Sequence, residues 1–262
     1  MHESRRKLLD QVRVILVEPS HPGNIGAAAR ALKTMGLSEL AVVRPERFPD
    51  PQAQWRAAGA QDILARTIIY DTVADAIADR QWIVGTSTRQ RRIPWPLLMA
   101  DAVAEDLTSK LINTRVAILF GRESSGLTND ELQLCHCHLQ IPANPEYPSL
   151  NLAMAVQIVC YELFKRLSSE DVAESPWDRP PANAAQMQGL LAHLQEMLIE
   201  AEFLDAANPG QTMTRLRRLL SRVAPDETEV QMLRGILKQL GNSPRRQTTM
   251  IGVRSSERER QP

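Results

Sequence analysis

Six short apolar runs in the first 141 residues predict buried β-strands. The fifth run, Val116–Phe120, is continuously apolar rather than alternating, which is typical of a strand covered on both faces. Helical patterns separate most of the runs, and strands that alternate with helices form a parallel sheet. We therefore expect an α/β domain with a parallel sheet and helices on both faces. The predicted strands are Val12–Val17, Leu40–Val43, Thr67–Tyr70, Trp82–Gly85, Val116–Phe120 and His138–Ile141, and helices are expected near 25–35, 54–64, 72–79 and 97–107.

Two of these strands run into loops that are suited to hold a ligand. The fifth strand stops at the turn Gly121–Gly126, and the sixth meets Pro142–Pro148, which contains three prolines. Proline continues neither a strand nor a helix interior, so this second loop should be stiff and extended. Ser149 is then a plausible N-cap for an apolar helix that reaches Leu163. Because ligands of open α/β sheets bind at the carboxyl ends of strands, we expect both loops to face a binding site.

The first expected helix begins with very small side chains. Its start reads Asn24-Ile-Gly-Ala-Ala-Ala-Arg30, which lets another backbone or a phosphate come close. The free N–H groups of a helix start also favour an anion, and Arg30 lies one helical turn after Gly26 on the same surface. Close packing against another helix would explain the small residues by themselves. Together with the two loops, they favour a ligand site.

A polar and basic loop follows the fourth strand. Its hydroxyls and arginines are suited to bind a ligand or an RNA phosphate, although a solvated loop explains the same composition. The residues concerned are Thr86, Ser87, Thr88, Arg89, Arg91 and Arg92.

Three segments together resemble the motifs of the SPOUT superfamily of RNA 2'-O-methyltransferases. They are Asn24–Arg30 (NIGAAAR), Phe120–Leu127 (FGRESSGL) and Ile141–Val156 (IPANPEYPSLNLAMAV). Within the superfamily, the variant of these motifs and an appended helical region resemble the bacterial TrmJ-type tRNA (cytidine/uridine-2'-O-)-methyltransferases. The resemblance is strong over residues 12–167 and weak beyond them.

The resemblance implies a C-terminal trefoil knot in the α/β domain and a homodimer whose interface builds the active site. It also implies S-adenosyl-L-methionine as the cofactor, without a metal, and 2'-O-methylation of cytidine or uridine at position 32 of the tRNA anticodon loop. The catalytic candidates are Arg30, Glu123, Ser149 and Asn151. The cofactor-binding candidates are Thr86, Ser87, Thr88, Gly121, Ile141, Pro148, Ser149 and Leu150. The RNA-binding candidates are Asn24, Arg30, Arg89, Arg91, Arg92, Arg215 and Arg218.

The role of Arg30 is narrowed by its chemistry. The family pattern makes the matching arginine a base or an activator, but a guanidinium stays protonated in proteins. It is better suited to stabilise a developing oxyanion or to hold the adjacent phosphate. Glu123 is a candidate to hold Arg30 in place, while Ser149 and Asn151 are candidates to orient the ribose or the arginine.

The sequence changes character after residue 167. Residues 1–167 form the expected methyltransferase domain, 168–184 are polar and proline-rich and predict a linker, and 185–262 predict a helical, basic region with a charged, disordered tail. Helices are expected over 185–203, 212–223 (with Thr212 as cap) and 227–240. The chain has 31 basic and 31 acidic residues, but residues 211–262 hold eleven basic and five acidic ones. This excess favours a tRNA contact, and a small bundle that only packs against the dimer is the alternative.

Other features exclude several classes of protein. The three cysteines and the absence of a long apolar segment predict a soluble, cytoplasmic protein with reduced thiols and no membrane partner. The cluster Cys135–His138 lacks the second, separated ligand pair of a structural zinc site, so we expect packing residues there. No Walker A or GxGxxG sequence occurs. Two alternatives to a tRNA enzyme stay open: a same-family rRNA 2'-O-methyltransferase and a catalytically inactive RNA-binding SPOUT protein.

Overall fold

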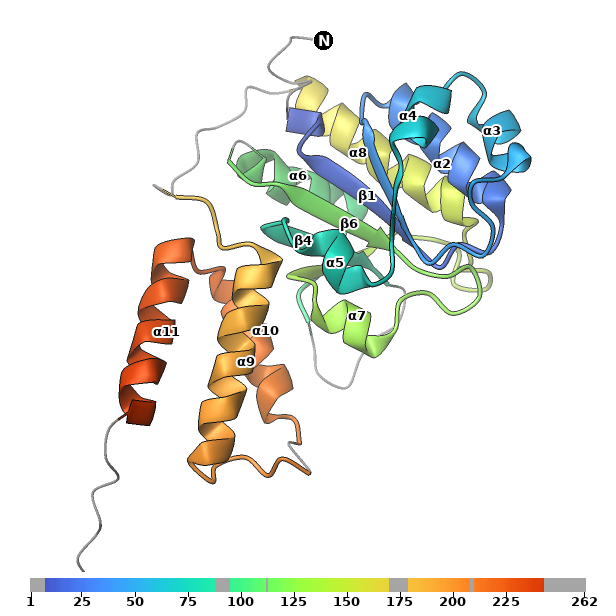
Figure 1. Cartoon of the computed structure of the whole chain (residues 1–262). Helices are drawn as coiled ribbons and strands as arrows, with labels where there is room; N and C mark the ends of the chain where they lie inside the picture. Colours follow the sequence, from blue (N-terminus) through green and yellow to red (C-terminus); the bar gives the residue numbers. More distant parts are fainter. Residues whose placement is uncertain (1–7, 88–94, 112, 170–178, 208–209, 243–262) are drawn as a thin grey trace, which may run out of the picture.

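The computed structural model describes residues 8–87, 95–111, 113–169, 179–207 and 210–242. At its centre lies a seven-stranded sheet of order β3-β2-β1-β6-β4-β7-β5 in which every pair of neighbours is parallel (Figure 1). The predicted parallel sheet is therefore confirmed, while the trefoil knot stays a prediction. The strands are β1 (Val12–Val17), β2 (Glu39–Val43), β3 (Ile68–Tyr70), β4 (Trp82–Thr86), β5 (Leu97–Met99), β6 (Val116–Phe120) and β7 (Cys137–Gln140).

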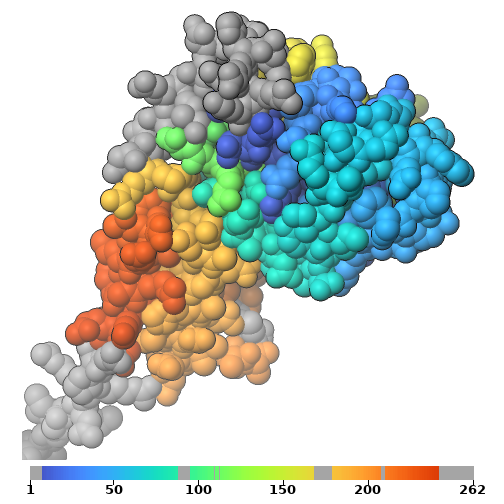
Figure 2. Space-filling model, turned by 45° about the horizontal axis from the view of Figure 1, so that its top comes forward, coloured from blue at the N-terminus to red at the C-terminus, as the bar shows by residue number. Residues whose placement is uncertain are grey.

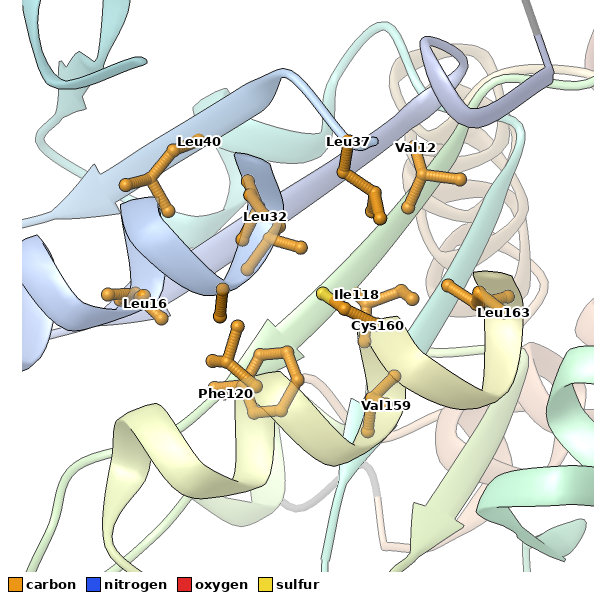
Figure 3. Packing of buried hydrophobic residues seen from close by; sticks show 14 of the residues in the cluster. Val12, Leu16, Leu32, Leu37, Leu40, Ile118, Phe120, Val159, Cys160 and Leu163 are labelled. Atoms are coloured by element: carbon orange, nitrogen blue, oxygen red, sulfur yellow. The ribbon is translucent and has the colours of Figure 1, made fainter. Parts of the chain in front are cut away.

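Helices cover both faces of the sheet, as the apolar runs predict. One face packs against α2 (Pro22–Thr34), α3 (Pro51–Ala57), α4 (Gln61–Arg66), α6 (Ala100–Lys110) and α8 (Leu152–Ser169), and the other packs against α5 (Val73–Ile77) and α7 (Asn129–Gln133). Within β1, Val14 and Leu16 join the first core, whereas Ile15 and Val17 join the second. Figure 3 shows the first core, where side chains of α8 meet Leu32 of α2 and Phe120 of β6.

The short edge strand β5 corrects the prediction of a helix from Leu97 to Leu107. Leu97–Met99 pairs with β7, and α6 begins only at Ala100. The run Leu-Leu-Met is made of good helix formers, so its local propensity favoured the helix. Pairing with β7, which the local sequence does not encode, gives these residues their extended conformation.

The small residues at the start of α2 serve helix packing. A Cβ atom on Gly26 would lie 2.0 Å from the carbonyl oxygen of Ala53 in α3. Since no real side chain tolerates that separation, Gly26 allows α2 and α3 to touch through their backbones. The interpretation of Gly26 as part of a ligand site is therefore wrong, and the helix-packing alternative holds at this residue.

Three C-terminal helices form a lobe below the sheet domain, drawn in orange and red in Figures 1 and 2. They are α9 (Ala184–Glu200), α10 (Thr212–Val223) and α11 (Glu227–Asn242), and their small core includes Ala182, Leu190 and Val230. The lobe is joined to the sheet domain by backbone bonds, because the N–H groups of Ala184 and Ala185 donate to the carbonyl groups of Arg80 and Ala78, at 2.8 and 3.1 Å.

The helix starts in this lobe differ in one respect from the prediction. Asn183 caps α9 through a reciprocal pair of hydrogen bonds with Gln186. The N-cap of α10 is Gln211 without a side-chain hydrogen bond, so the prediction that Thr212 is the cap is wrong.

Among the described residues, no helix combines the length and the apolar character needed to cross a membrane.

Candidate functional site

Loops at the carboxyl ends of β4, β6 and β7 surround a cavity of about 690 Å³. This volume is typical of small-molecule sites. Seven of the predicted cofactor positions lie on its wall, and Thr88 falls outside the described residues together with Arg89, Arg91 and Arg92. The seven are Thr86, Ser87, Gly121, Ile141, Pro148, Ser149 and Leu150. The structure thus brings together loops that are distant in sequence, while their binding roles stay predictions.

The loop after β6 folds back on itself next to the cavity. The N–H group of Gly126 donates to the carbonyl of Arg122 at 2.9 Å, and the N–H group of Arg122 donates to Gly126 at 3.3 Å. Gly126 has a φ of +71°, a left-handed conformation that favours glycine. A Cβ atom on Gly121 would lie 2.1 Å from the carbonyl carbon of Gly126. Glycine at both positions is therefore required for this narrow turn.

Arg122 stabilises this turn through its side chain. It was not among the predicted site residues. Its guanidinium donates to Glu18 at 2.6 Å and forms a two-pronged contact with Glu131 at 2.9 and 3.0 Å. The hydrogen bonds with Glu131 and then Glu18 raise the pKa of Arg122 above its ordinary value. Burial opposes ionisation of Glu131, but the bonds from Arg122 and Thr128 lower its pKa overall. The turn thus rests on a partly buried ionic cluster.

The sequence offers a signal for this clamp. Thr128 and Glu131 form a capping box at the start of α7, which follows the turn directly. A capping-box glutamate still has a free side for a cation, so a nearby arginine is a natural partner. The second acid, Glu18, lies 104 residues away in sequence, and only the fold brings it to Arg122.

A chain of hydrogen bonds connects the three motifs. The amide of Asn24 donates to the carboxylate of Glu123 at 2.9 Å, and the amide of Asn151 donates to the side-chain oxygen of Asn24 at 3.1 Å. Glu123 also accepts the backbone N–H groups of Ser20 and His21, at 3.2 and 3.5 Å. Burial would raise the pKa of Glu123, but these hydrogen bonds lower it overall, so the carboxylate is ionised at neutral pH. Asn24 is the central member of this chain.

Two expectations about these residues are corrected. Glu123 contacts Asn24 and the β1–α2 turn rather than Arg30. Asn151, rather than Ser149, caps α8, because its side-chain oxygen accepts the N–H group of Ala153 at 2.9 Å. Ser149 is exposed on the wall of the cavity. The proline-rich loop therefore continues up to Asn151, which postpones the helix start.

Arg30 lies outside the cavity wall. It is exposed on α2, six residues beyond Asn24, and forms no ion pair with the described residues. Its guanidinium is therefore available to a ligand that approaches α2 from solvent.

The predicted RNA-binding residues of α10 lie in the C-terminal lobe. Arg215 is exposed and Arg218 is half-buried. Arg217 is half-buried, and burial lowers its pKa below the ordinary value. On the same helix, the hydroxyl of Thr214 donates to the side chain of Gln133 in α7 at 3.3 Å. The basic helix thus contacts the helix that carries Glu131.

The Cys135–His138 cluster packs inside the sheet domain. Cys135 and Cys137 are buried, and burial raises the pKa of Cys137 to about 12. His136 stacks on Trp82, with ring centroids 4.5 Å apart, and its Nδ1 atom accepts the N–H group of Ile83 at 3.1 Å. Burial, followed by the nearby charge of Lys110, lowers the pKa of His136 to about 4. In the described part of the chain, no three His, Cys, Asp or Glu side chains gather as a metal site would require.

Comparison with known proteins identifies the family. Residues 11–161 match the SpoU rRNA methylase family, and residues 185–249 match the C-terminal domain of the tRNA methyltransferase TrmJ. The curated tRNA (cytidine/uridine-2'-O-)-methyltransferase TrmJ from Citrobacter koseri is 45% identical over 234 residues, which cover 88% of this chain and 96% of that protein. The chain belongs to the TrmJ family of SpoU methylases. The resemblance predicted from the three motifs is confirmed.

Solved structures agree with this membership of the TrmJ family. The crystal structure of TrmJ from Z. mobilis is 33% identical and has a TM-score of 0.77, with 87% of this chain and 98% of that chain covered. The SpoU methyltransferase AviRb from Streptomyces viridochromogenes, solved in complex with AdoMet, is 22% identical with a TM-score of 0.50 over 62% of each chain. The second likeness shows the fold alone.

Proposed function

We propose that this chain transfers the methyl group of S-adenosyl-L-methionine to the 2'-oxygen of a tRNA ribose, at cytidine or uridine 32 of the anticodon loop. The observation that carries the proposal is the hydrogen-bonded chain Glu123–Asn24–Asn151, which connects all three motifs beside a cavity of cofactor size. The curated TrmJ relative, named as a tRNA 2'-O-methyltransferase, supports the choice of substrate. AviRb, which shares the fold, was solved in complex with AdoMet.

The cavity fits the proposed cofactor. Its volume of about 690 Å³ lies in the usual range for small-molecule sites, and its wall combines loop backbone with the side chains of Thr86, Ser149 and Leu152. The narrow turn at Gly121 brings backbone groups to its edge. We propose that the loops after β4, β6 and β7 hold S-adenosyl-L-methionine, which supplies a methyl group already activated on a sulfonium.

The residues of the chain would then act on the ribose. Ionised Glu123 fixes the amide of Asn24, and Asn24 in turn orients Asn151. This arrangement holds the start of α2 against the cavity loops. We propose that Arg30, which stays protonated, stabilises negative charge that develops on the 2'-oxygen or holds the adjacent phosphate. Thr86, Gly121, Ile141 and Leu150 are the proposed cofactor contacts.

The C-terminal lobe is the proposed tRNA grip. The excess of basic residues after 210 suits a polyanion, and α10 presents Arg215 to solvent. We propose that the protein works as a homodimer and that the lobe contacts the tRNA outside the anticodon loop. A truncated chain that ends before residue 175 would then bind the cofactor but fail to methylate tRNA.

One alternative has its own support, because the matching family model is described as an rRNA methylase. The match to the TrmJ C-terminal domain favours tRNA instead. Mass spectrometry of nuclease digests, after incubation with unmodified tRNA transcripts or rRNA fragments in the presence of a chelator, separates the two. We expect one 2'-O-methyl group at position 32 of tRNA, and none when that nucleotide carries a 2'-deoxyribose. Methylation of rRNA alone, of a base, or only with added metal would contradict the proposal.

A further inference from the structure

Trp55 on α3 is a large aromatic side chain that faces solvent. Its exposed fraction is 78%, the highest among the exposed large apolar side chains of the described residues. Trp82, in contrast, packs between His136 and Lys110 inside the sheet domain. The apolar ring of an exposed tryptophan stays in contact with water in the folded protein, which is unfavourable. Tryptophan is also enriched where proteins bind partners.

The position of Trp55 relative to α2 is well defined. The contact of Gly26 with the backbone of Ala53 holds α3 against α2. The side chain of the next residue, Arg56, packs against Gly23, since a Cβ atom there would lie 3.5 Å from its Cγ atom. Gly23 precedes Asn24 directly, so α3 borders the first turn of the motif that leads to Arg30.

Arg56 and Arg30 border the same face of α2. Gly23 and Arg30 are seven residues apart, which on an α-helix is close to two full turns and about 10 Å of axial rise. A ligand that lies along this face therefore meets Arg56 at one end and Arg30 at the other. In Figure 1, α2 lies between α3 and α8, which confines such a ligand to the outer face.

The charges on α2, on α3 and on the loop that precedes α3 are unbalanced. Arg30, Arg47 and Arg56 are exposed and form no ion pair with the residues that the structure describes. Other arginines on this side are paired, such as Arg44 with Glu18 and Arg66 with Asp62. The loop that carries Arg47 also holds the acids Glu46 and Asp50, of which Asp50 caps α3. Three arginines against two acids leave a net positive charge. This loop is fixed in turn, because the N–H group of Glu46 donates to the carbonyl of Pro19 at 3.2 Å.

We propose that Trp55, Arg47 and Arg56 form a platform for a single-stranded segment of the substrate RNA, next to the nucleotide that is methylated. The inference rests on the proposed function and extends its substrate contacts to α3. A base stacks on the Trp55 ring, and the arginines contact the phosphates on either side. An exposed aromatic ring, with an unpaired cation on its own helix and another on the loop before it, matches the alternation of bases and phosphates in a single strand. A second copy of this chain would bring the same unpaired cations instead of phosphates.

The test compares matched variants of the full chain in binding to a labelled, unmodified tRNA transcript. We expect Trp55→Ala to weaken binding about tenfold or more, since stacking is lost, and Trp55→Phe to keep most of the affinity. Arg56→Ala should lower the slope of log affinity against log salt by about 0.7, the value for one single-strand phosphate. Arg66→Ala is the control, because Arg66 is exposed but already paired with Asp62, and it should change neither the affinity nor the slope.

Binding, methyl transfer and oligomeric state are measured separately on the same proteins. A Trp55→Ala protein whose affinity for tRNA is within twofold of that of the wild type overturns the inference. A Trp55→Ala protein whose sedimentation shows a changed oligomeric state overturns it as well. Calorimetry should give an unchanged affinity for S-adenosyl-L-methionine in all four variants. A wild-type chain that binds tRNA through Trp55 but transfers no methyl group refutes the proposed function and leaves the platform standing.

Discussion

Replacement of Arg122 by alanine tests whether the ionic cluster under the cavity loop supports both the fold and the site. The variant removes one cation from between two carboxylates, Glu18 and Glu131. The side chains of Arg122 and Glu131 are 18% and 12% exposed, which places this pair between a surface pair and a fully buried one. Removal of one partner from a buried pair costs about 3–5 kcal/mol, and an exposed pair contributes at most about 1 kcal/mol. We therefore expect Arg122→Ala to lower the free energy of unfolding by about 2–3 kcal/mol.

Urea unfolding at two pH values measures this loss. The pKa values of Glu18 and Glu131 are lowered in the folded state by Arg122, so the stability they contribute is present above the unfolded value of about 4.3. It is lost as pH falls through their folded values. The difference between wild type and Arg122→Ala should therefore shrink as the pH is lowered from 7 to below 4.

Two further variants make the comparison specific. Arg44 contacts the same Glu18 but is 59% exposed, so Arg44→Ala should cost under about 1 kcal/mol. Arg122→Lys keeps a charge but loses the two-pronged contact with Glu131, and we expect an intermediate loss. Cofactor affinity, measured by calorimetry, should fall only in the Arg122 variants, because Arg122 also donates to the carbonyl of Gly126 in the loop. An Arg122→Ala protein as stable as Arg44→Ala would refute the reasoning.

Four more variants address single features. Gly121→Ala should abolish cofactor binding in calorimetry, because a Cβ atom there would lie 2.1 Å from the carbonyl carbon of Gly126. Gly126→Ala should weaken binding less, because its Cβ atom meets nothing within 4 Å and its cost is only the strain of an alanine at a φ of +71°. Arg30→Ala should abolish methyl transfer to tRNA with little change in cofactor affinity, and near-normal turnover would remove Arg30 from the mechanism. His136→Asn keeps an acceptor for the N–H group of Ile83 but cannot titrate. Because the pKa of His136 is about 4 in the folded protein and about 6.5 when unfolded, the free energy of unfolding of the wild type should fall by about 1–2 kcal/mol from pH 7.5 to pH 5. The urea midpoint of the variant should depend less on pH.

The fold was predictable from sequence wherever the pattern reflected burial. The continuous apolar run Val116–Phe120 has both faces buried, and so has Val12–Val17, in which the one polar residue, Arg13, is buried as well, so these runs predict central strands. β5 was not predictable in this way. Its three residues are held at the sheet edge by β7, and two of them, Leu97 and Met99, are more than 40% exposed. Burial therefore left no signal at this strand.

The candidate site was predictable as a set of loops but not as a network. Gly121, Ser149 and Leu150 line the cavity because strand ends of a parallel sheet lie at one edge. The partners within the site depend on the β1–α2 turn, where the N–H groups of Ser20 and His21 hold Glu123. Sequence patterns contain no information about which of several polar groups a carboxylate selects. Glu123 was accordingly assigned to Arg30, although Asn24 is its partner.

The start of α2 connects packing to chemistry through residues on opposite sides of one helix. Gly26 faces α3 and lets the two backbones touch, whereas Asn24 faces the cavity loops and binds Glu123 and Asn151. A side chain at Gly26 would push α3 outward and, with it, Trp55 and Arg56. Because Arg30 lies on the face between these two contacts, α2 must be held from both sides for its guanidinium to have a fixed position. The small residues of the motif therefore act on the substrate indirectly, by fixing the helix that presents Arg30.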